Sequence, residues 1–176
     1  MIRAIPLALT FAVFTACSLP PPSGLPNRIT GIAGPLLAIH NRERAAFGSP
    51  LLGWDPALAA AATAHAAQLA GLGRLQHALR SVRLGQGENL WIGTRGAYPI
   101  EAMAGTWASE KRHFRPGRFP ANSRTENGAD VGHYTQMVWP STGRMGCGMA
   151  SSARWDVLVC RYAPAGNVDG VMLGRR

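Results

Sequence analysis

The sequence predicts one α+β domain, because helical patterns fill its earlier part and strand patterns come late. With 176 residues, of which 47% are hydrophobic, the chain can build a single domain with a substantial core. Three segments have helical periodicity or helix-boundary residues, and two later segments have the pattern of an antiparallel hairpin. Helices and strands that are separated along the chain favour a layered α+β arrangement.

The N-terminus has the features of an export signal. Arg3 precedes an apolar run from Ala4 to Phe14, which has signal length and is too short to span a bilayer. The following Thr15-Ala16-Cys17 resembles a bacterial lipoprotein cleavage site, although Phe14 stands where an aliphatic residue is usual. Lipidation of Cys17 and plain secretion are alternatives, and both require export. We therefore expect a signal peptide, a linker, the domain and a short tail at residues 1–16, 17–33, 34–170 and 171–176.

Two helices have clear start signals. Gly34-Pro35 places proline at the first helical position, and this helix is expected to end at Gly48. Asp55-Pro56 combines a capping carboxylate with the same use of proline. The alanine-rich run that follows has high helix propensity and is expected to end near Leu72.

The third predicted helix carries a carboxylate on its apolar side. It begins near Pro99, and its stripe of Ile100, Met103 and Trp107 is continued by Glu110 at the same spacing. A carboxylate is rarely buried alone, because removing it from water without a partner is costly. Glu110 is therefore expected to meet a cation or a metal that another part of the chain supplies.

Cys147 and Cys160 are expected to form a disulfide. Lipidation would consume Cys17 and leave an even pair of cysteines in an oxidising compartment. Met145 to Ala150 and Val157 to Tyr162 have strand patterns, and folding them about the 153/154 midpoint places the two cysteines opposite each other. Such a bond contributes roughly 3 kcal/mol in the chain-entropy estimate. The alternative is a pair of buried thiols.

The net charge of +9 comes almost entirely from arginine, since Lys111 is the only lysine. The arginines are scattered along the sequence and are not grouped with stacking aromatic residues, so no nucleic-acid partner is expected. We interpret the charge as a solvated surface suited to an anionic envelope.

Five short motifs occur in an order that is typical of one family, and together they resemble the CAP superfamily. This superfamily comprises the cysteine-rich secretory proteins, antigen 5 and the pathogenesis-related proteins (SCP domain), and it has many bacterial members. The resemblance covers roughly residues 36–168 and implies a three-layer α-β-α sandwich. It also implies a short helix at His133 to Trp139, where periodicity alone leaves helix or strand open. The motifs are His40-Asn41-Arg42-Glu43-Arg44, Leu52-Gly53-Trp54-Asp55, Gly87-Glu88-Asn89-Leu90, Gly132 to Trp139, and Leu158 to Val168.

The resemblance further implies a cleft lined by two histidines and two glutamates, which correspond to His77, Glu88, Glu110 and His133. Two neutral imidazoles can bind Zn²⁺ or another divalent cation, so His77 and His133 are the expected metal ligands. A cluster in which each imidazolium pairs with a carboxylate can equally be structural. Tyr134 and Gln136 are expected to hold the histidine segment in place by packing and hydrogen bonding.

The other histidines are expected to lie outside this cleft. His40 and His65 are on apolar helix stripes and are interpreted as packing residues, while His113 would at most flank the cleft. The sequence contains no His-Glu-x-x-His motif, and no serine or cysteine has the setting of a nucleophile.

The leading hypothesis is an exported, non-enzymatic binding module at the cell envelope or outside the cell. Its ligand would be a hydrophobic or amphipathic small molecule or an envelope component, with a divalent cation in the cleft. The alternative is a metal-dependent hydrolase or protease that uses the same four residues, with a carboxylate as general base toward a metal-bound water. A third hypothesis is a purely structural or toxin-like secreted protein.

Overall fold

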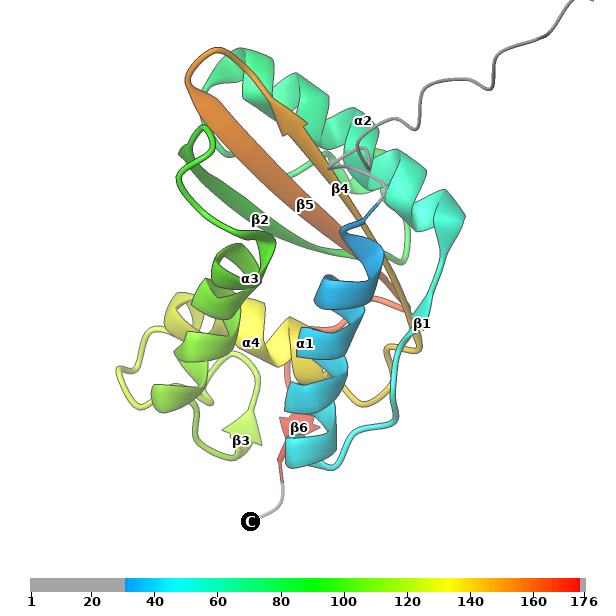
Figure 1. Cartoon of the computed structure of the whole chain (residues 1–176). Helices are drawn as coiled ribbons and strands as arrows, with labels where there is room; N and C mark the ends of the chain where they lie inside the picture. Colours follow the sequence, from blue (N-terminus) through cyan, green and yellow to red (C-terminus); the bar gives the residue numbers. More distant parts are fainter. Residues whose placement is uncertain (1–30, 175–176) are drawn as a thin grey trace, which may run out of the picture.

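The computed structural model describes residues 31–174. The predicted signal peptide, Cys17 and most of the predicted linker lie outside these residues. Figure 1 shows the helices and strands of the described part, and short 3₁₀ turns lie at Arg80–Val82, Glu110–Arg112 and Gly128–Val131. The helices are α1 (Ala33–Phe47), α2 (Pro56–Leu72), α3 (Ile100–Ser109) and α4 (Gly132–Val138). The strands are β1 (Gly53–Trp54), β2 (Gly87–Thr94), β3 (Gly117–Arg118), β4 (Arg144–Ser151), β5 (Trp155–Ala163) and β6 (Met172–Leu173).

Most helix boundaries follow from the residues that predicted them, but α1 begins at Ala33, so that Pro35 is its third residue and not its first. Helix α1 ends where Gly48 takes a left-handed conformation with φ of 87°. Helix α2 is capped by the Asp55 carboxylate, which accepts from the backbone N–H groups of Ala57 and Leu58 at 2.9 and 3.1 Å. The segment after Gly132 is a helix, as the family resemblance implied.

The main sheet has the strand order β1-β4-β5-β2. Strand β1 is parallel to β4, whereas β5 is antiparallel to both of its neighbours, β4 and β2. The β4–β5 hairpin has the predicted register: Cys147 lies directly opposite Cys160, and a disulfide joins them. The predicted disulfide is therefore present, and it ties the two central strands together.

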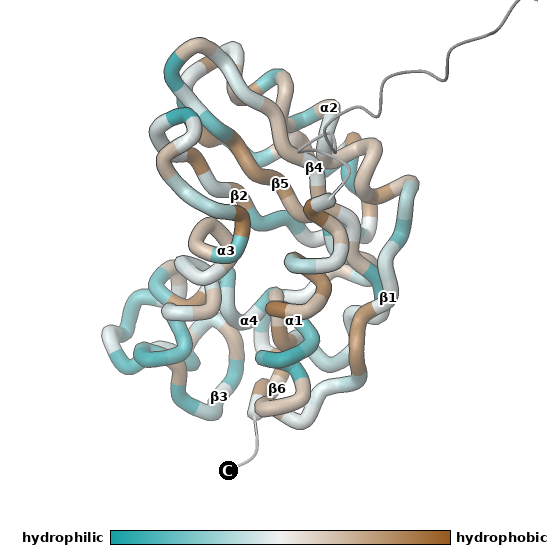
Figure 2. The backbone as a smooth tube through the Cα atoms, in the orientation of Figure 1, coloured by the Kyte–Doolittle hydropathy of each residue, from teal (hydrophilic) through white to brown (hydrophobic). Residues whose placement is uncertain are grey.

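Helices cover both faces of this sheet, which confirms the three-layer α-β-α sandwich (Figure 1). Helix α2 packs on one face, and α1, α3 and α4 lie on the other (Figure 1). Each interface has its own core, built around Leu69, Leu90 and Val157 on the α2 side and around Trp107 and Tyr162 on the other. Figure 2 shows hydrophobic residues along β5 in the middle of the sandwich, while the connection from α3 to α4 is largely hydrophilic.

Helix α2 lies unusually close to the sheet, because β4 presents glycines to it. A Cβ atom at Gly146 would collide with the backbone nitrogen of Ala59, and one at Gly148 would collide with the backbone nitrogen of Thr63. Neither obstacle is a flexible side chain, so these two positions require glycine.

Arg44 of α1 is fully buried and hydrogen-bonds to the backbone at the end of α4 and just after it. Its Nη1 donates to the carbonyl oxygens of Met137 and Trp139, both at 2.9 Å, and its Nη2 donates to that of Thr142 at 2.7 Å. Its Nε donates to the carbonyl oxygen of Pro50. Burial lowers the pKa of Arg44 to about 10, which still leaves the guanidinium charged at neutral pH.

The ordered domain extends past the boundary predicted at residue 170. Residues 172–173 form β6, which pairs with β3, and the Leu173 side chain is buried. The backbone of Phe119 also exchanges hydrogen bonds with Gly170 and Val171. The expected tail thus belongs to the domain at least as far as Gly174, because an apolar side chain in it is buried against the 114–120 loop.

Among residues 31–174, no helix combines the length and the apolar character that crossing a membrane requires.

Candidate functional site

His77 and Glu88 form one ion pair at the start of β2. The Nδ1 of His77 lies 2.8 Å from Oε1 of Glu88, and the same oxygen accepts from the backbone N–H of Ala78 at 3.0 Å. The Glu88 side chain is fully buried, whereas 56% of the His77 side chain is exposed. The carboxylate therefore holds Nδ1 of an imidazole that is more than half exposed.

The second oxygen of Glu88 faces two further nitrogen-bearing side chains. Nε of Arg161 on β5 is 2.8 Å away, at a contact distance without hydrogen-bond alignment, and Nε2 of His65 on α2 is 3.8 Å away. Burial opposes ionisation of the carboxyl group. The hydrogen bonds from His77 and Ala78 and the nearby positive charges outweigh it, so the pKa of Glu88 lies below its ordinary value. Glu88 is thus a charged acceptor in a cationic setting.

Glu110 and His133 form a second pair. Oε1 of Glu110 lies 2.6 Å from Nδ1 of His133, and Oε2 accepts from the backbone N–H groups of His133 and Tyr134 at 2.9 and 3.1 Å. Glu110 begins a 3₁₀ turn after α3, so it caps the first turn of α4 as well as binding the ring. The partner that the sequence required for Glu110 is His133.

The structure brings the four residues together as two pairs and not as one cluster. Within residues 31–174, no hydrogen bond or ion pair joins the pair of His77 and Glu88 to the pair of Glu110 and His133. Successive side chains of a strand point to opposite faces, so Glu88 faces α2 while Asn89 faces α4. Asn89 donates to the carbonyl oxygen of His133 at 3.1 Å, which links β2 to the second pair.

Aromatic and amide side chains around α4 support the His133 segment. The ring of Trp107 stacks on that of His133 with centroids 6.0 Å apart, and Tyr134 packs edge-on against Phe114. Gln136 accepts from the backbone N–H of Gly166 at 2.9 Å, which holds the C-terminal turn against α4. These contacts are of the kind expected for Tyr134 and Gln136.

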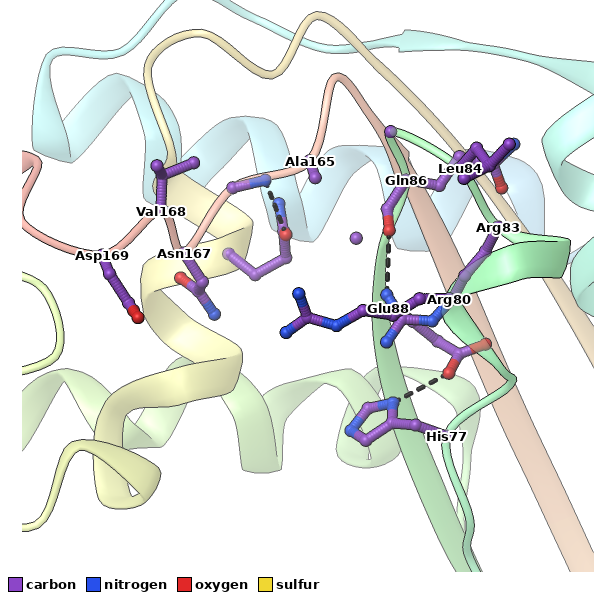
Figure 3. Close-up of a pocket in the computed structure, with 14 residues that line it drawn as sticks. His77, Arg80, Arg83, Leu84, Gln86, Glu88, Ala165, Asn167, Val168 and Asp169 are labelled. Atoms are coloured by element: carbon purple, nitrogen blue, oxygen red, sulfur yellow. Dashed lines mark hydrogen bonds and ion pairs between the residues drawn. The ribbon is translucent and has the colours of Figure 1, made fainter.

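Two cavities flank His77. A polar one of about 590 Å³ separates His77 and Glu88 from Asn167 and Asp169 of the C-terminal turn (Figure 3). The other, of about 530 Å³, is a groove between α2 and the following loop, which we call the α2 groove. Its walls are mostly apolar, and the buried Arg161 is one of the polar residues that line it. The residues lining it are Ala61, Ala64, His65, Gln68, Leu69, Leu72, Gln76, His77, Ala78, Leu79, Val82 and Arg161. His77 lines both cavities, and Glu110 and His133 line neither.

Of the two histidines and two glutamates, only the imidazoles have nitrogen atoms left for a metal ion. In the described part of the chain, no three His, Cys, Asp or Glu side chains are placed to hold one metal ion. Each carboxylate instead orients a histidine through Nδ1, an arrangement that is common behind metal-binding imidazoles. The Nε2 atoms of His77 and His133 would be the available ligands, and solvent would have to complete the coordination.

Two residues near Glu88 are not marked as site residues by the sequence pattern. His65 was interpreted as a packing residue, and Arg161 was overlooked in its apolar strand. Both are largely buried beside Glu88. The reasoning that demanded a partner for Glu110 applies equally to them, because a charged group on an apolar face needs an opposite charge. His40, in contrast, is a fully buried packing residue, hydrogen-bonded to Leu36 and Tyr162.

Comparisons of the sequence with known proteins agree with these motifs. Residues 37–162 match the cysteine-rich secretory protein family, CAP. Pathogenesis-related leaf protein 4 of Solanum lycopersicum is 38% identical over 135 residues, which cover 76% of this chain and 78% of that protein. Pathogenesis-related protein 1 of Arabidopsis thaliana is 35% identical over 144 residues, which cover 81% of this chain and 83% of that protein. The Secreted protein RBT4 of Candida albicans is 34% identical over 145 residues, covering 80% of this chain and 37% of that protein.

Solved structures show the same fold. The structure described as NaASP2 with Zn²⁺ superposes with a TM-score of 0.71 at 22% identity, covering 86% of this chain and 90% of the other. The structure of BmVAL-1 superposes with a TM-score of 0.67 at 21% identity, covering 89% of this chain and 87% of the other. At these identities the likeness concerns the arrangement of the backbone alone.

Proposed function

Because this chain belongs to the cysteine-rich secretory protein (CAP) family, we propose that it is an exported, non-enzymatic binding module for an amphipathic small molecule. The observation that carries the proposal is the meeting of an apolar groove and a polar cavity at His77. Each has a volume within the range of small-molecule sites, about 300–1,000 Å³. An apolar tail in the α2 groove would place its polar head near His77, His65 and Arg161.

We place the protein outside the cytoplasm, at a bacterial cell envelope. The N-terminal pattern of Arg3, an apolar run and Thr15-Ala16-Cys17 supports export, and lipidation of Cys17 would keep the domain at the membrane. One relative, from Candida albicans, is named as a secreted protein. The disulfide between Cys147 and Cys160 also suits an oxidising compartment.

Filling the α2 groove tests the ligand proposal. Ala64 lines the groove and is exposed, so Ala64→Trp should block the groove without disturbing the core. We expect a fluorescent single-chain fatty acid to bind the wild-type protein saturably and the variant at least about tenfold more weakly, since displaced apolar contact costs about 1.4 kcal/mol or more. Fluorescence titration measures both affinities.

The matched control for this titration is Ala60→Trp. Ala60 is an exposed alanine of the same helix and lines neither cavity. The control should bind the fatty acid like the wild type. Equal affinities for all three proteins, or no saturable binding by any of them, would contradict the assignment of the groove.

We further propose that a divalent cation binds Nε2 of His77 and of His133. The support is that Glu88 and Glu110 orient these rings through Nδ1 and that both rings are partly exposed. Calorimetric titration with Zn²⁺ should reveal one site per chain, and both His77→Ala and His133→Ala should abolish it. Retention of the site in either single variant would show that the two histidines do not share a metal.

The contacts of the two carboxylates disfavour the hydrolase alternative. Both oxygens of Glu88 face cations or N–H donors, and its pKa is held below the ordinary value. Glu110 accepts from two backbone N–H groups and pairs with His133. A carboxylate stabilised in its charged form is a weak general base at neutral pH.

A further inference from the structure

Residues 72–84, which lead from α2 toward β2, expose an unusual amount of apolar surface. Leu79, Val82 and Leu84 are 70%, 68% and 81% exposed, and Leu72 is 58% exposed. Single exposed leucines are ordinary, but four large aliphatic side chains more than half exposed within 13 residues form a patch. We call this stretch the 72–84 segment.

The 72–84 segment is also positively charged. It contains Arg74, Arg80 and Arg83, and the chain has no acidic residue between Asp55 and Glu88. Arg74 and Arg80 are exposed, and neither forms an ion pair within the described residues. Aliphatic and basic side chains thus share a surface that lacks negative charge of its own.

The exposure of the patch results from a backbone that is held in place. The carbonyl oxygen of Gln76 is hydrogen-bonded to the His65 ring at 2.9 Å, and the Ala78 N–H donates to Glu88 at 3.0 Å. Arg83 closes the loop on itself by donating to the carbonyl oxygens of Ala78 and Gln86 at 2.9 and 3.0 Å. These bonds hold the aliphatic side chains outward, where they cannot turn into the core.

We propose that the 72–84 segment rests on the surface of an anionic lipid bilayer. Aliphatic side chains on a basic segment can enter the boundary between headgroups and acyl chains, while arginines bind the lipid phosphates. This mode needs no membrane-spanning helix. It does not depend on the lipidation of Cys17. Leu72, Leu79 and Val82 also line the α2 groove, so the test below changes residues of the segment that line neither cavity.

The charges of the segment favour a bilayer over two other partners. A twofold dimer through this patch would set three arginines of one copy against the same three of the other, which is repulsive. A single-stranded nucleic acid would call for aromatic side chains to stack on its bases, and the segment has none. Lipid phosphates complement the arginines, and acyl chains complement the leucines.

Vesicle sedimentation tests the proposal with residues 18–176, which lack the signal and Cys17 but retain every residue of both cores. We expect the protein to bind vesicles of phosphatidylcholine mixed with phosphatidylglycerol, and to bind pure phosphatidylcholine far more weakly. Higher salt should weaken the binding. Leu75 is a further aliphatic residue of the segment and is 38% exposed. The variant Arg74→Gln/Leu75→Ser should bind about tenfold more weakly, since each arginine near an anionic surface accounts for about fivefold.

The control variant is Arg42→Gln/Leu51→Ser, which makes the same chemical changes away from the segment. The Arg42 side chain is 67% exposed and Leu51 is 62% exposed, so both variants should fold like the wild type, as thermal melting checks. The proposal is overturned if neutral and anionic vesicles bind equally or if the two variants bind alike. A vesicle-free dimer that Arg74→Gln/Leu75→Ser disrupts would also overturn it.

Arg74 and Leu75 line neither cavity, so this variant should take up the fluorescent fatty acid like the wild type. A protein that binds vesicles but no fatty acid would contradict only the proposed function. The reverse result would contradict only the membrane surface.

Discussion

Replacing Arg44 with methionine is expected to lower the free energy of unfolding by about 4 kcal/mol. The guanidinium donates to four backbone carbonyl oxygens, those of Pro50, Met137, Trp139 and Thr142, and all of them would lose a charged donor. Each such group costs about 1–3 kcal/mol when it is left buried without a partner, and methionine recovers part of this through its apolar side chain. Urea unfolding followed by circular dichroism measures the change.

Two further variants sharpen this result. Arg44→Lys should recover only part of the loss, because a single ammonium group cannot reach four acceptors that a planar guanidinium spans. Arg42→Met removes the exposed neighbouring arginine and should change stability by less than about 0.5 kcal/mol. A loss below about 1 kcal/mol for Arg44→Met would mean that water replaces the guanidinium at these carbonyls.

The second large effect is expected for Glu88→Gln, at about 3 kcal/mol of lost stability at pH 7. The change keeps the size of the side chain but leaves Arg161 buried without its anion and removes a charged acceptor from His77 and Ala78. Breaking a buried pair by removing one charge typically costs about 3–5 kcal/mol. Glu101→Gln, on the exposed first turn of α3, is the matched control and should cost only a few tenths of a kcal/mol.

The effect of Glu88→Gln should depend on pH in a definite direction. The pKa of Glu88 is lower in the folded protein than its ordinary value of 4.5. The charged carboxylate therefore stabilises the fold fully above pH 4.5, and this contribution is lost as the pH falls through the folded pKa. Unfolding measured at pH 7 and again in acid should show the wild type approaching the variant. A difference that grows toward low pH would contradict this assignment.

The fold was largely predictable because its signals are local. Asp55-Pro56 and Gly48 mark helix ends by backbone chemistry that does not depend on the rest of the chain. The register that pairs Cys147 with Cys160 follows from counting residues about the turn. The end of the domain was misplaced, since the burial of Leu173 depends on a loop some 55 residues earlier in the chain.

The need of Glu110 for a partner was predictable, but the arrangement of the four candidate residues was not. Because Glu110 continues the apolar face of a helix, the sequence predicts that it has a partner, and His133 is that partner. Which histidine meets which glutamate depends on the faces of β2, and those follow from the sheet and not from spacing along the chain. His65 and Arg161 were missed because apolar neighbours in the sequence made them look like packing residues.

The contact of α2 with Gly146 and Gly148 determines how the α2 groove can change shape. With no side chain between helix and strand at these positions, backbone meets backbone, and the helix has no room to slide or roll. One wall of the groove is thus as rigid as the sheet beneath it. A bulky ligand can be accommodated only if the opposite wall, residues 76–82, shifts outward, and that wall carries His77 together with Leu79 and Val82 of the aliphatic patch. A ligand that fills the α2 groove would therefore also shift the part of the aliphatic patch that Leu79 and Val82 form.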